Sequence, residues 1–291
     1  MSASVEGASV ALSDGNYVRG KVIVVTGAGS GFGRLTSHQA ATLGASVVAA
    51  DVDGDAAAET VAHIVAAGGQ AEAVTADVTR KDDMDRVALV AVERFGAIDV
   101  LINNAGVMPL AFFSDHKEAW EAWDRAIDIN VKGVVHGIAA VYDRMIEQGR
   151  GHIVNISSVY GNRGTAGSGV YSATKAAVIA ISDALRVEAQ GKIKVTVVRP
   201  TGVPGTNLAS GIVNFEAFVG ITGQNSQQFS EQVTRWVGGT LPAAAQDADN
   251  VAYWALAPEE LAAQIVAVIN TPWGVNISDI TIRSTGEDYV Q

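Results

Sequence analysis

The sequence of 291 residues contains no cysteine. Disulfides, thiol nucleophiles and cysteine-bound metals are therefore excluded, and the composition fits a reducing compartment, which we expect to be the cytoplasm. No apolar run approaches the roughly 20 residues that cross a bilayer, and residues 1–20 lack the basic start and apolar core of a signal peptide. We expect no membrane partner, a loose N-terminal arm over residues 1–20, and one domain over residues 21–291.

Positive charge is also scarce. Lys and Arg number 20 against 31 Asp and Glu, which gives a formal net charge of −11. Nucleic acids reward a basic face, so we expect no nucleic-acid partner. The five histidines lack the spacing of metal ligands, and we expect no metal site. An anionic cofactor is still compatible with this charge, because helix N-termini and backbone amides can hold it locally.

Hydrophobic residues make up 48% of the chain, and short β-branched runs alternate with alanine-rich amphipathic stretches. The short runs are nearly continuous in apolar character, which is typical of strands covered on both faces. The predicted strands are residues 21–26, 46–50, 71–76, 98–103, 152–157, 193–199 and 277–283. The predicted helices end near residue 43, cover 55–67, 81–95, 118–148 and 170–190, and restart at 258. This alternation predicts an α/β fold: a single-domain, Rossmann-type, doubly wound parallel sheet of about seven strands with helices on both faces.

Residues 201–257 interrupt this alternation. They contain glycine, asparagine and glutamine with scattered aromatic residues, and they show no clear strand. A stretch of this length inside a compact domain usually covers a binding site. We therefore predict a substrate-binding lid over residues 201–257, after the sixth strand, and its composition suggests an apolar, bulky substrate.

The first predicted strand runs directly into Gly27-Ala28-Gly29-Ser30-Gly31-Phe32-Gly33, and a helix follows. Glycines let the backbone approach a pyrophosphate closely, and the helix N-terminus offers free N–H groups and a partial positive charge. We expect Gly27, Ser30, Gly31, Phe32 and Gly33 to bind a dinucleotide. A tight turn without a ligand is the alternative, because the G-x-x-x-G-x-G spacing departs from the commoner G-x-G-x-x-G fingerprint.

Asp51 stands at the end of the second predicted strand, 20 residues beyond Gly31. A carboxylate at this place can accept hydrogen bonds from both hydroxyls of the adenosine ribose, whereas a 2′-phosphate would meet its negative charge. Asp53 and Asp55 follow closely, and no Lys or Arg is near enough in sequence to compensate. The alternative is an ordinary strand-end aspartate in a turn. The pattern favours NAD over NADP.

Tyr171 and Lys175 lie four residues apart at the start of an alanine-rich helix, so both face the same side. A phenol has a pKa near ~10, and a nearby ammonium should lower that pKa towards the range useful for acid–base catalysis. Ser158 follows the strand 152–157, at the sheet edge where binding sites open. Its hydroxyl could hydrogen-bond a substrate oxygen while Tyr171 exchanges the proton. Ser157, its neighbour, is expected to face the sheet interior.

Together these motifs make residues 20–200 resemble the short-chain dehydrogenase/reductase family. The matching residues are Thr26-Gly27-x-x-x-Gly31-x-Gly33, Asp77, Asn103-Asn104-Ala105-Gly106, Asn130, Ser158, Tyr171-x-x-x-Lys175 and Pro200. Their order and separations fit the family, including the 13 residues from Ser158 to Tyr171.

The resemblance implies a catalytic set of Asn130, Ser158, Tyr171 and Lys175. It also implies that Asn130 positions a water in a proton relay, that Lys175 holds the nicotinamide ribose, and that Asp77 and Val78 flank the adenine. The remaining residues expected along the cofactor are Asn104, Ala105, Gly106, Tyr171, Pro200, Gly202, Val203 and Thr206.

Two departures from the family pattern concern the end of the site. Pro200 is followed by Thr201 where the family has glycine, and Gly205 stands where the family has threonine, so Thr206 is the candidate for the contact with the nicotinamide amide. The C-terminus lacks the frequent Val-Asp-Gly-Gly ending, and residues 276–284 with the polar tail resemble a branch that includes hydroxy-acid and serine dehydrogenases.

The sequence therefore predicts an NAD-dependent oxidoreductase, a homo-oligomer (dimer or tetramer), that interconverts a secondary alcohol and a ketone with Tyr171 as acid/base. One alternative is a 3-oxoacyl-carrier-protein reductase, against which Asp51 argues because that role more often uses NADP. The other is a non-catalytic NAD-sensing regulatory protein, which would not need Ser158, Tyr171 and Lys175 together. Trp120 and Trp123, near a helix start, are interpreted as packing residues.

Overall fold

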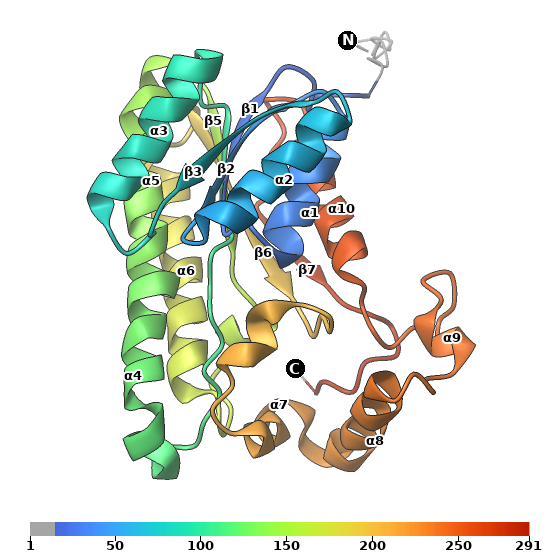
Figure 1. Ribbon diagram of the computed structural model, residues 1–291. Helices are drawn as coiled ribbons and strands as arrows, with labels where there is room; N and C mark the ends of the chain where they lie inside the picture. Colours follow the sequence, from blue (N-terminus) through green and yellow to red (C-terminus); the bar gives the residue numbers. More distant parts are fainter. Residues whose placement is uncertain (1–14, 291) are drawn as a thin grey trace, which may run out of the picture.

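The computed structural model describes residues 15–290, so residues 1–14 of the predicted arm lie outside the described residues. Its centre is a sheet of seven strands in the order β3-β2-β1-β4-β5-β6-β7 (Figure 1). The strands are β1 Val22–Thr26, β2 Ser46–Asp51, β3 Gln70–Thr75, β4 Val100–Asn103, β5 Gly151–Ile156, β6 Ile193–Pro200 and β7 Asp279–Ile282. All neighbours pair in parallel. The predicted Rossmann-type fold is confirmed.

Both faces of the sheet are buried over the central strands β1, β2, β4, β5 and β6, whereas the edge strands β3 and β7 are partly exposed. Ile23 and Val25 belong to one core, with the helices α1 and α10, whereas Val22 and Val24 belong to the other, with α3, α5 and α6. The helices of the first face are α1 Gly31–Thr42, α2 Gly54–Ala66 and α10 Pro258–Ile269. Those of the second are α3 Lys81–Phe95, α5 Gly133–Glu147 and α6 Gly169–Glu188, with α4 His116–Ile127 extending beyond the sheet (Figure 1).

The predicted long helix over residues 118–148 is interrupted. A π-helical turn, Asp128–Lys132, separates α4 from α5. Such turns hold one extra residue and often occur at functional sites. Here the turn carries Asn130, whose side chain bonds the main chain of Val107 in the loop after β4. The sequence does not predict this turn, because apolar residues continue at helical spacing from α4 into α5.

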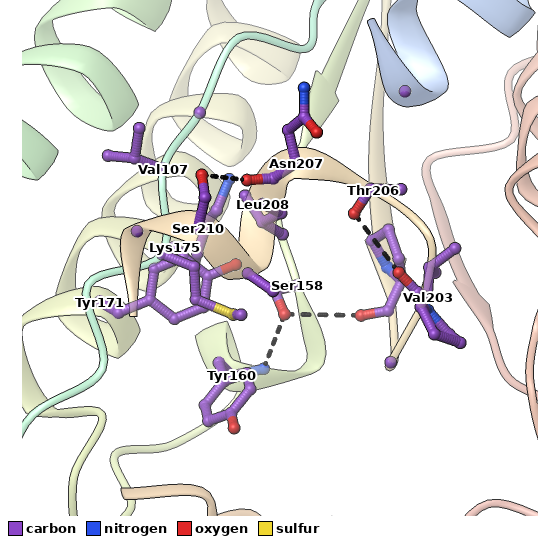
Figure 2. Close-up of a pocket in the computed structure, with 18 of the residues that line it drawn as sticks. Val107, Ser158, Tyr160, Tyr171, Lys175, Val203, Thr206, Asn207, Leu208 and Ser210 are labelled. Atoms are coloured by element: carbon purple, nitrogen blue, oxygen red, sulfur yellow. Dashed lines mark hydrogen bonds between the residues drawn. The ribbon is translucent and has the colours of Figure 1, made fainter. Parts of the chain in front are cut away.

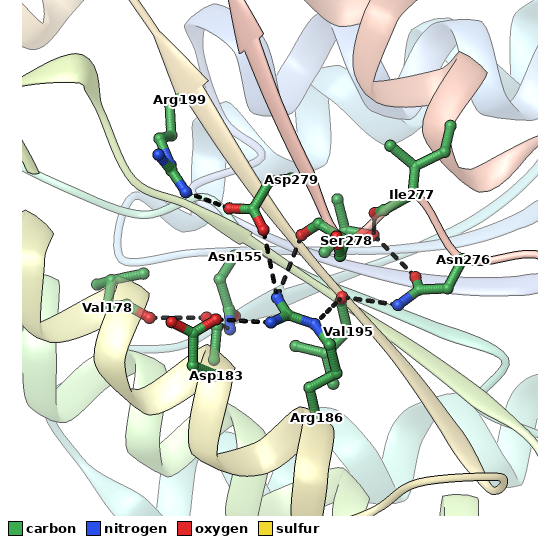
Figure 3. Close-up of polar contacts among 12 residues, drawn as sticks. Asn155, Val178, Asp183, Arg186, Val195, Arg199, Asn276, Ile277, Ser278 and Asp279 are labelled. Carbon is green, nitrogen blue, oxygen red and sulfur yellow. Dashed lines mark hydrogen bonds and ion pairs between the residues drawn. The ribbon is translucent and has the colours of Figure 1, made fainter. Parts of the chain in front are cut away.

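The edge strand β7 is held in place by arginines from neighbouring elements (Figure 3). Arg186 on α6 donates hydrogen bonds of 3.2 Å to the main-chain carbonyls of Val195 and Ser278. Arg199 on β6 pairs with Asp279 at the start of β7. These contacts position the chain that leaves β7 and returns towards the carboxyl ends of the other strands.

Residues 201–257 contain the short helices α7 Val219–Thr222 and α9 Ala243–Gln246 and the longer α8 Ser226–Val237, and no strand. They lie beyond the carboxyl ends of the strands, and the C-terminus returns to the space between them and the sheet (Figure 1). Within residues 15–290, none of the helices has the length and apolar character needed to cross a membrane.

Candidate active site

A cleft of about 1600 Å³ opens between the carboxyl ends of the strands and residues 201–237. Of the residues predicted to bind the cofactor, Gly33 is the only one that does not line it. The others are Gly27, Ser30, Gly31, Phe32, Asp51, Asp77, Val78, Asn104, Ala105, Gly106, Tyr171, Lys175, Pro200, Gly202, Val203 and Thr206. Residues far apart in sequence thus form one continuous wall.

The glycine turn shapes one end of this cleft. Gly27 and Gly31 have positive φ angles of 65° and 49°, which L side chains rarely adopt. A Cβ atom on Gly33 would collide with the main-chain carbonyl of Gly27, so Gly33 serves the packing of α1 against the turn. The first turn of α1 has no acidic residue, and the Ser30 hydroxyl does not cap it. Its N–H groups can therefore hold an anion such as a pyrophosphate.

Asp51 lies at the end of β2, beside this turn. Its Oδ2 atom accepts a hydrogen bond of 2.7 Å from the main-chain N–H of Gly29, and its Oδ1 atom accepts one of 3.0 Å from that of Asp53. Both bonds fix the carboxylate at the rim of the cleft, where a ribose diol can reach its remaining lone pairs.

Asn104 braces the ends of β1 and β4 against each other. Its Nδ2 atom donates a hydrogen bond of 2.9 Å to the carbonyl of Thr26, while the Thr26 hydroxyl accepts bonds from the N–H groups of Asn104 (3.0 Å) and Ala105 (3.1 Å). In the loop after β3, the Asp77 carboxylate accepts a 2.9 Å bond from the N–H of Thr79. These hydrogen bonds between protein atoms fix the shape of the cleft wall.

Ser158, Tyr171 and Lys175 meet on the wall below the lid (Figure 2). The Ser158 Oγ atom accepts a 3.2 Å bond from the N–H of Tyr160 and donates one of 3.5 Å to the carbonyl of Pro200. Lys175 donates through Nζ to the carbonyl of Ile156 at 2.9 Å. All three candidate catalytic side chains are buried.

Ser157 also lines the cleft, but its hydroxyl is bonded within the protein. Its hydroxyl donates a 2.8 Å hydrogen bond to the main-chain carbonyl of Lys175, which ties the end of β5 to α6. A Cβ atom on Gly161 would lie 2.9 Å from both the Ser157 Oγ atom and the carbonyl oxygen of Lys175, so the packing here is close. Ser157 therefore contributes to the position of α6, and the Ser158 hydroxyl belongs to the cleft.

Burial controls the acid–base properties of the pair on α6. It raises the pKa of Tyr171 to about 12, and hydrogen bonding with Ser158 acts in the opposite direction. Burial also lowers the pKa of Lys175 to about 8. The direction for Tyr171 is opposite to the lowering that we expect from the sequence, because loss of water around the phenol is the largest effect on its pKa. The Lys175 Nζ atom lies 5.8 Å from the Tyr171 ring centre. The buried phenol is a proton donor at neutral pH.

Asn130, the fourth candidate, lies behind this wall. Its Oδ1 atom accepts a 2.9 Å bond from the N–H of Val107, and its Nδ2 atom donates to the Val107 carbonyl (2.9 Å) and to the Thr174 hydroxyl (3.1 Å). The side-chain amide is thus occupied by the protein. It links the loop after β4 to α6, next to Lys175.

The loop after Pro200 differs from the family pattern in its glycine and threonine positions. Gly205 has a positive φ of 85°, and Thr206 lines the cleft with its hydroxyl 3.4 Å from the Val203 carbonyl. The Thr201 hydroxyl instead donates to the Ile282 carbonyl at 3.3 Å. Both threonines line the cleft, and Thr206 is the one whose hydroxyl is not bonded to the end of β7.

Several residues that line the cleft belong to none of the motifs in the sequence. They are Tyr160, which follows Ser158, the lid residue Trp254, and Glu287, Asp288 and Tyr289 near the C-terminus. Trp120, interpreted as a packing residue, lines the cleft and is 67% exposed, whereas Trp123 is buried against Phe113.

Known proteins share this arrangement. The short chain dehydrogenase family matches residues 21–217. An uncharacterised oxidoreductase of Listeria monocytogenes is 32% identical over 272 residues, which cover 94% of this chain and 99% of the relative. A solved 7α-hydroxysteroid dehydrogenase, complexed with NADH and 7-oxo glycochenodeoxycholic acid, is 25% identical with a TM-score of 0.75 and coverage of 94% and 96%. A 3-ketoacyl-(acyl-carrier-protein) reductase from Brucella melitensis, complexed with NADH, is 26% identical with a TM-score of 0.73 and coverage of 92% and 99%.

Proposed function

The chain belongs to the short-chain dehydrogenase family and is an oxidoreductase, and from this premise we propose that it interconverts a secondary alcohol and a ketone with NAD(H). The observation that carries the proposal is the meeting of Ser158, Tyr171 and Lys175 on one wall of a cleft whose other end holds Asp51 and the N-terminus of α1.

The lining fits a dinucleotide. Gly27 and Gly31 keep side chains away from the turn, the first N–H groups of α1 suit the pyrophosphate, and Asp51 suits the adenosine ribose. Similar structures hold NAD or NADP, so the family does not decide between them. Asp51 supports NAD, because its charge would oppose a 2′-phosphate.

When bound, the nicotinamide supplies or accepts the hydride. The protein manages the proton. In the reductive direction Tyr171, neutral because burial raises its pKa to about 12, donates its phenolic proton to the developing alkoxide, which is more basic than phenolate. Ser158 hydrogen-bonds the same oxygen and holds it near the phenol.

Lys175 then assists the return of the proton. Its pKa of about 8 places it near the working pH, so it can release and take up a proton beside the phenolate. Its bond to the Ile156 carbonyl and the Ser157 bond to its own carbonyl fix its position. Asn130 secures the neighbouring turn of α6 through Thr174.

The similarity to a 3-ketoacyl-(acyl-carrier-protein) reductase supports a second candidate, reduction of a carrier-bound 3-oxoacyl group. Among the cleft residues from Pro200 onwards, the charged side chains are Glu216, Glu287 and Asp288, all acidic. An acidic carrier with a phosphorylated arm would meet no cation there, which favours a free small molecule as substrate.

The test is NADH and NADPH oxidation with a panel of apolar ketones and an acetoacetyl thioester, for wild type and Tyr171→Phe. We expect NADH-dependent reduction of a ketone by wild type and loss of at least about 10²-fold in the variant. Reduction of the thioester alone would select the second candidate. Tight NADH binding with no turnover of any substrate would leave the NAD-sensing role.

A further inference from the structure

The C-terminal strap, defined here as residues 284–290, crosses from the end of β7 to the lid. The N–H of Gly286 donates a 2.8 Å bond to the carbonyl of Tyr253, and the N–H of Val290 donates one of 2.9 Å to the carbonyl of Ile221 in α7. The strap is therefore fixed at both ends by main-chain bonds, and the residues between them have a defined place over the cleft.

Asp288 sets the orientation within the strap. Its buried carboxylate accepts a 2.7 Å hydrogen bond from the indole N–H of Trp254, and its main-chain carbonyl accepts one of 3.0 Å from Asn225. With Asp288 anchored in the lid on both its side chain and main chain, the next residue, Tyr289, lines the cleft.

Tyr289 lies among the residues around the candidate catalytic tyrosine. Its ring packs against the cluster that contains Tyr160 and Tyr171, and its centre is 5.9 Å from that of Phe229 in α8. A Cβ atom on Gly202 would collide with the Tyr289 hydroxyl, so this hydroxyl lies directly beside the loop that follows Pro200. The phenol thus lies between the cluster of Tyr171 and the loop that follows Pro200, and it lines the cleft there.

The hydroxyl of Tyr289 forms no hydrogen bond within residues 15–290. A phenol packed among other aromatic rings normally has a hydrogen-bond partner. Burial, together with the nearby carboxylates, raises its pKa above the ordinary value, so it is a neutral donor. The Tyr289 hydroxyl has no hydrogen-bond acceptor among the described residues.

The charge of the surroundings limits that acceptor. The lid and the strap place three acidic residues, Glu216, Glu287 and Asp288, on the lining of the cleft. Among the described lid and strap residues that line the cleft, none is a lysine or an arginine. On the lid and strap side of the cleft, a substrate carboxylate or phosphate beside Tyr289 would meet these acidic groups, whereas an uncharged oxygen would find a donor next to apolar residues such as Phe218 and Phe229.

We propose that Tyr289 is a specificity-determining residue that donates a hydrogen bond to a second, uncharged oxygen of the substrate, close to the reacting carbon. The substrate class is a bulky apolar ketone or alcohol with a neighbouring keto, hydroxyl or ether oxygen. This inference rests on the proposed function and refines it.

The experiment compares Tyr289→Phe with wild type on 1-phenylpropane-1,2-dione and on 1-phenylpropan-1-one, with NADH. The two probes differ only in the second oxygen. A neutral hydrogen bond contributes roughly 0.5–1.5 kcal/mol, so kcat/KM for the dione should fall by about 3- to 10-fold, chiefly through KM. The loss on the monoketone, which lacks the second oxygen, should be smaller, so the ratio of the two kcat/KM values should fall.

Tyr253→Phe is the matched control. The Tyr253 hydroxyl accepts a 2.7 Å bond from the N–H of Ala257 and does not line the cleft. Its removal should lower the unfolding temperature and leave the ratio of the two substrates unchanged. Tyr289→Phe removes no intramolecular bond, so its unfolding temperature should match that of wild type.

A second measurement separates this inference from the proposed function. Calorimetric titration of the dione into protein saturated with NAD should show an affinity several-fold weaker for Tyr289→Phe than for wild type. This difference is expected even if wild type turns over no ketone. The lack of turnover would then count against the proposed function and not against the role of Tyr289. Equal affinity, no binding to wild type, or equal losses of kcat/KM on both ketones would overturn the role of Tyr289. A wild-type preference for 2-oxo-2-phenylacetate over the dione would overturn the uncharged class.

Discussion

The carboxylate of Asp51 and the main chain of Gly29 are joined by a hydrogen bond of 2.7 Å, and a Cβ atom on Gly29 would lie 2.8 Å from that carboxylate. The turn between β1 and α1 thus has no room for a side chain beside Asp51. A cation that could bind a 2′-phosphate is excluded from position 29 as long as the carboxylate stays. Of these two positions, only Asp51 presents a side chain to the cleft, and the proposed preference for NAD rests on it.

Replacement of Asp51 by serine should weaken the preference for NAD from both sides. A charge-assisted bond contributes roughly 1.5–3 kcal/mol, so NAD affinity should fall by about 10- to 100-fold. NADP use should rise only modestly, because Arg34, which bonds the Ala56 carbonyl near this turn, is already paired with Glu59. The measurement is kcat/KM with each cofactor. Asp53→Ser is the control, since serine also caps α2, where Asp53 accepts a 3.0 Å bond from Ala56. A wild-type preference for NADP would refute the role of Asp51.

Tyr171→Phe keeps the buried ring and removes the transferable proton. Activity should fall by at least about 10²-fold, while NADH affinity barely changes. Single-turnover kinetics with NADH should locate the loss in the chemical step, and fluorescence titration should give the cofactor affinity. Turnover near that of wild type would end the tyrosine mechanism, and a parallel loss of NADH binding would indicate that the hydroxyl acts mainly in cofactor binding.

The sheet and the side of the cleft formed by the glycine turn and Asp51 could be predicted from the sequence, because both depend on local patterns. Apolar runs mark β1 to β6, and the glycine turn and Asp51 follow strand ends at fixed offsets. Tyr289 could not be predicted this way. It reaches the cleft only because β7, the strap and the Trp254–Asp288 bond return the C-terminus to the lid, and no periodic pattern encodes contacts between such distant segments.

The acid–base properties of Tyr171 and Lys175 were also beyond sequence reasoning. Spacing of four residues predicts a shared helix face, and the two residues do share one. The pKa values depend on the depth of burial, and both side chains are buried. Desolvation favours the neutral form of each group, so it raises the pKa of the phenol and lowers that of the ammonium.

Closure of the lid can be followed at a single bond. Arg235 is the only lysine or arginine in residues 201–257, it is exposed on α8, and the next residue, Trp236, lines the cleft. If ligands order the lid, trypsin cleavage after Arg235 should slow several-fold with NADH and a ketone bound. Mass spectrometry gives the rate at this site and at Lys192, an exposed control in the turn between α6 and β6. Identical protection at both sites, or none at Arg235, would argue against a closing lid.

The last prediction concerns the energetic consequence of burying Lys175. Its pKa is about 8 in the folded protein against an ordinary 10.5, so below pH 8 the ammonium is charged in both states and opposes folding. Since the unfolded chain binds more protons between about pH 8 and 10.5, the stability of wild type rises with pH in this window and the penalty is gone above it. Lys175→Met, which has similar volume and no charge, should therefore be inactive yet more stable than wild type at pH 7. From pH 7 to 9.5 this advantage should shrink by about 2 kcal/mol, as each pKa unit corresponds to about 1.4 kcal/mol. Urea unfolding of both proteins at the two pH values measures the difference. An advantage that stays constant or grows with pH would mean that burial does not lower the pKa of Lys175.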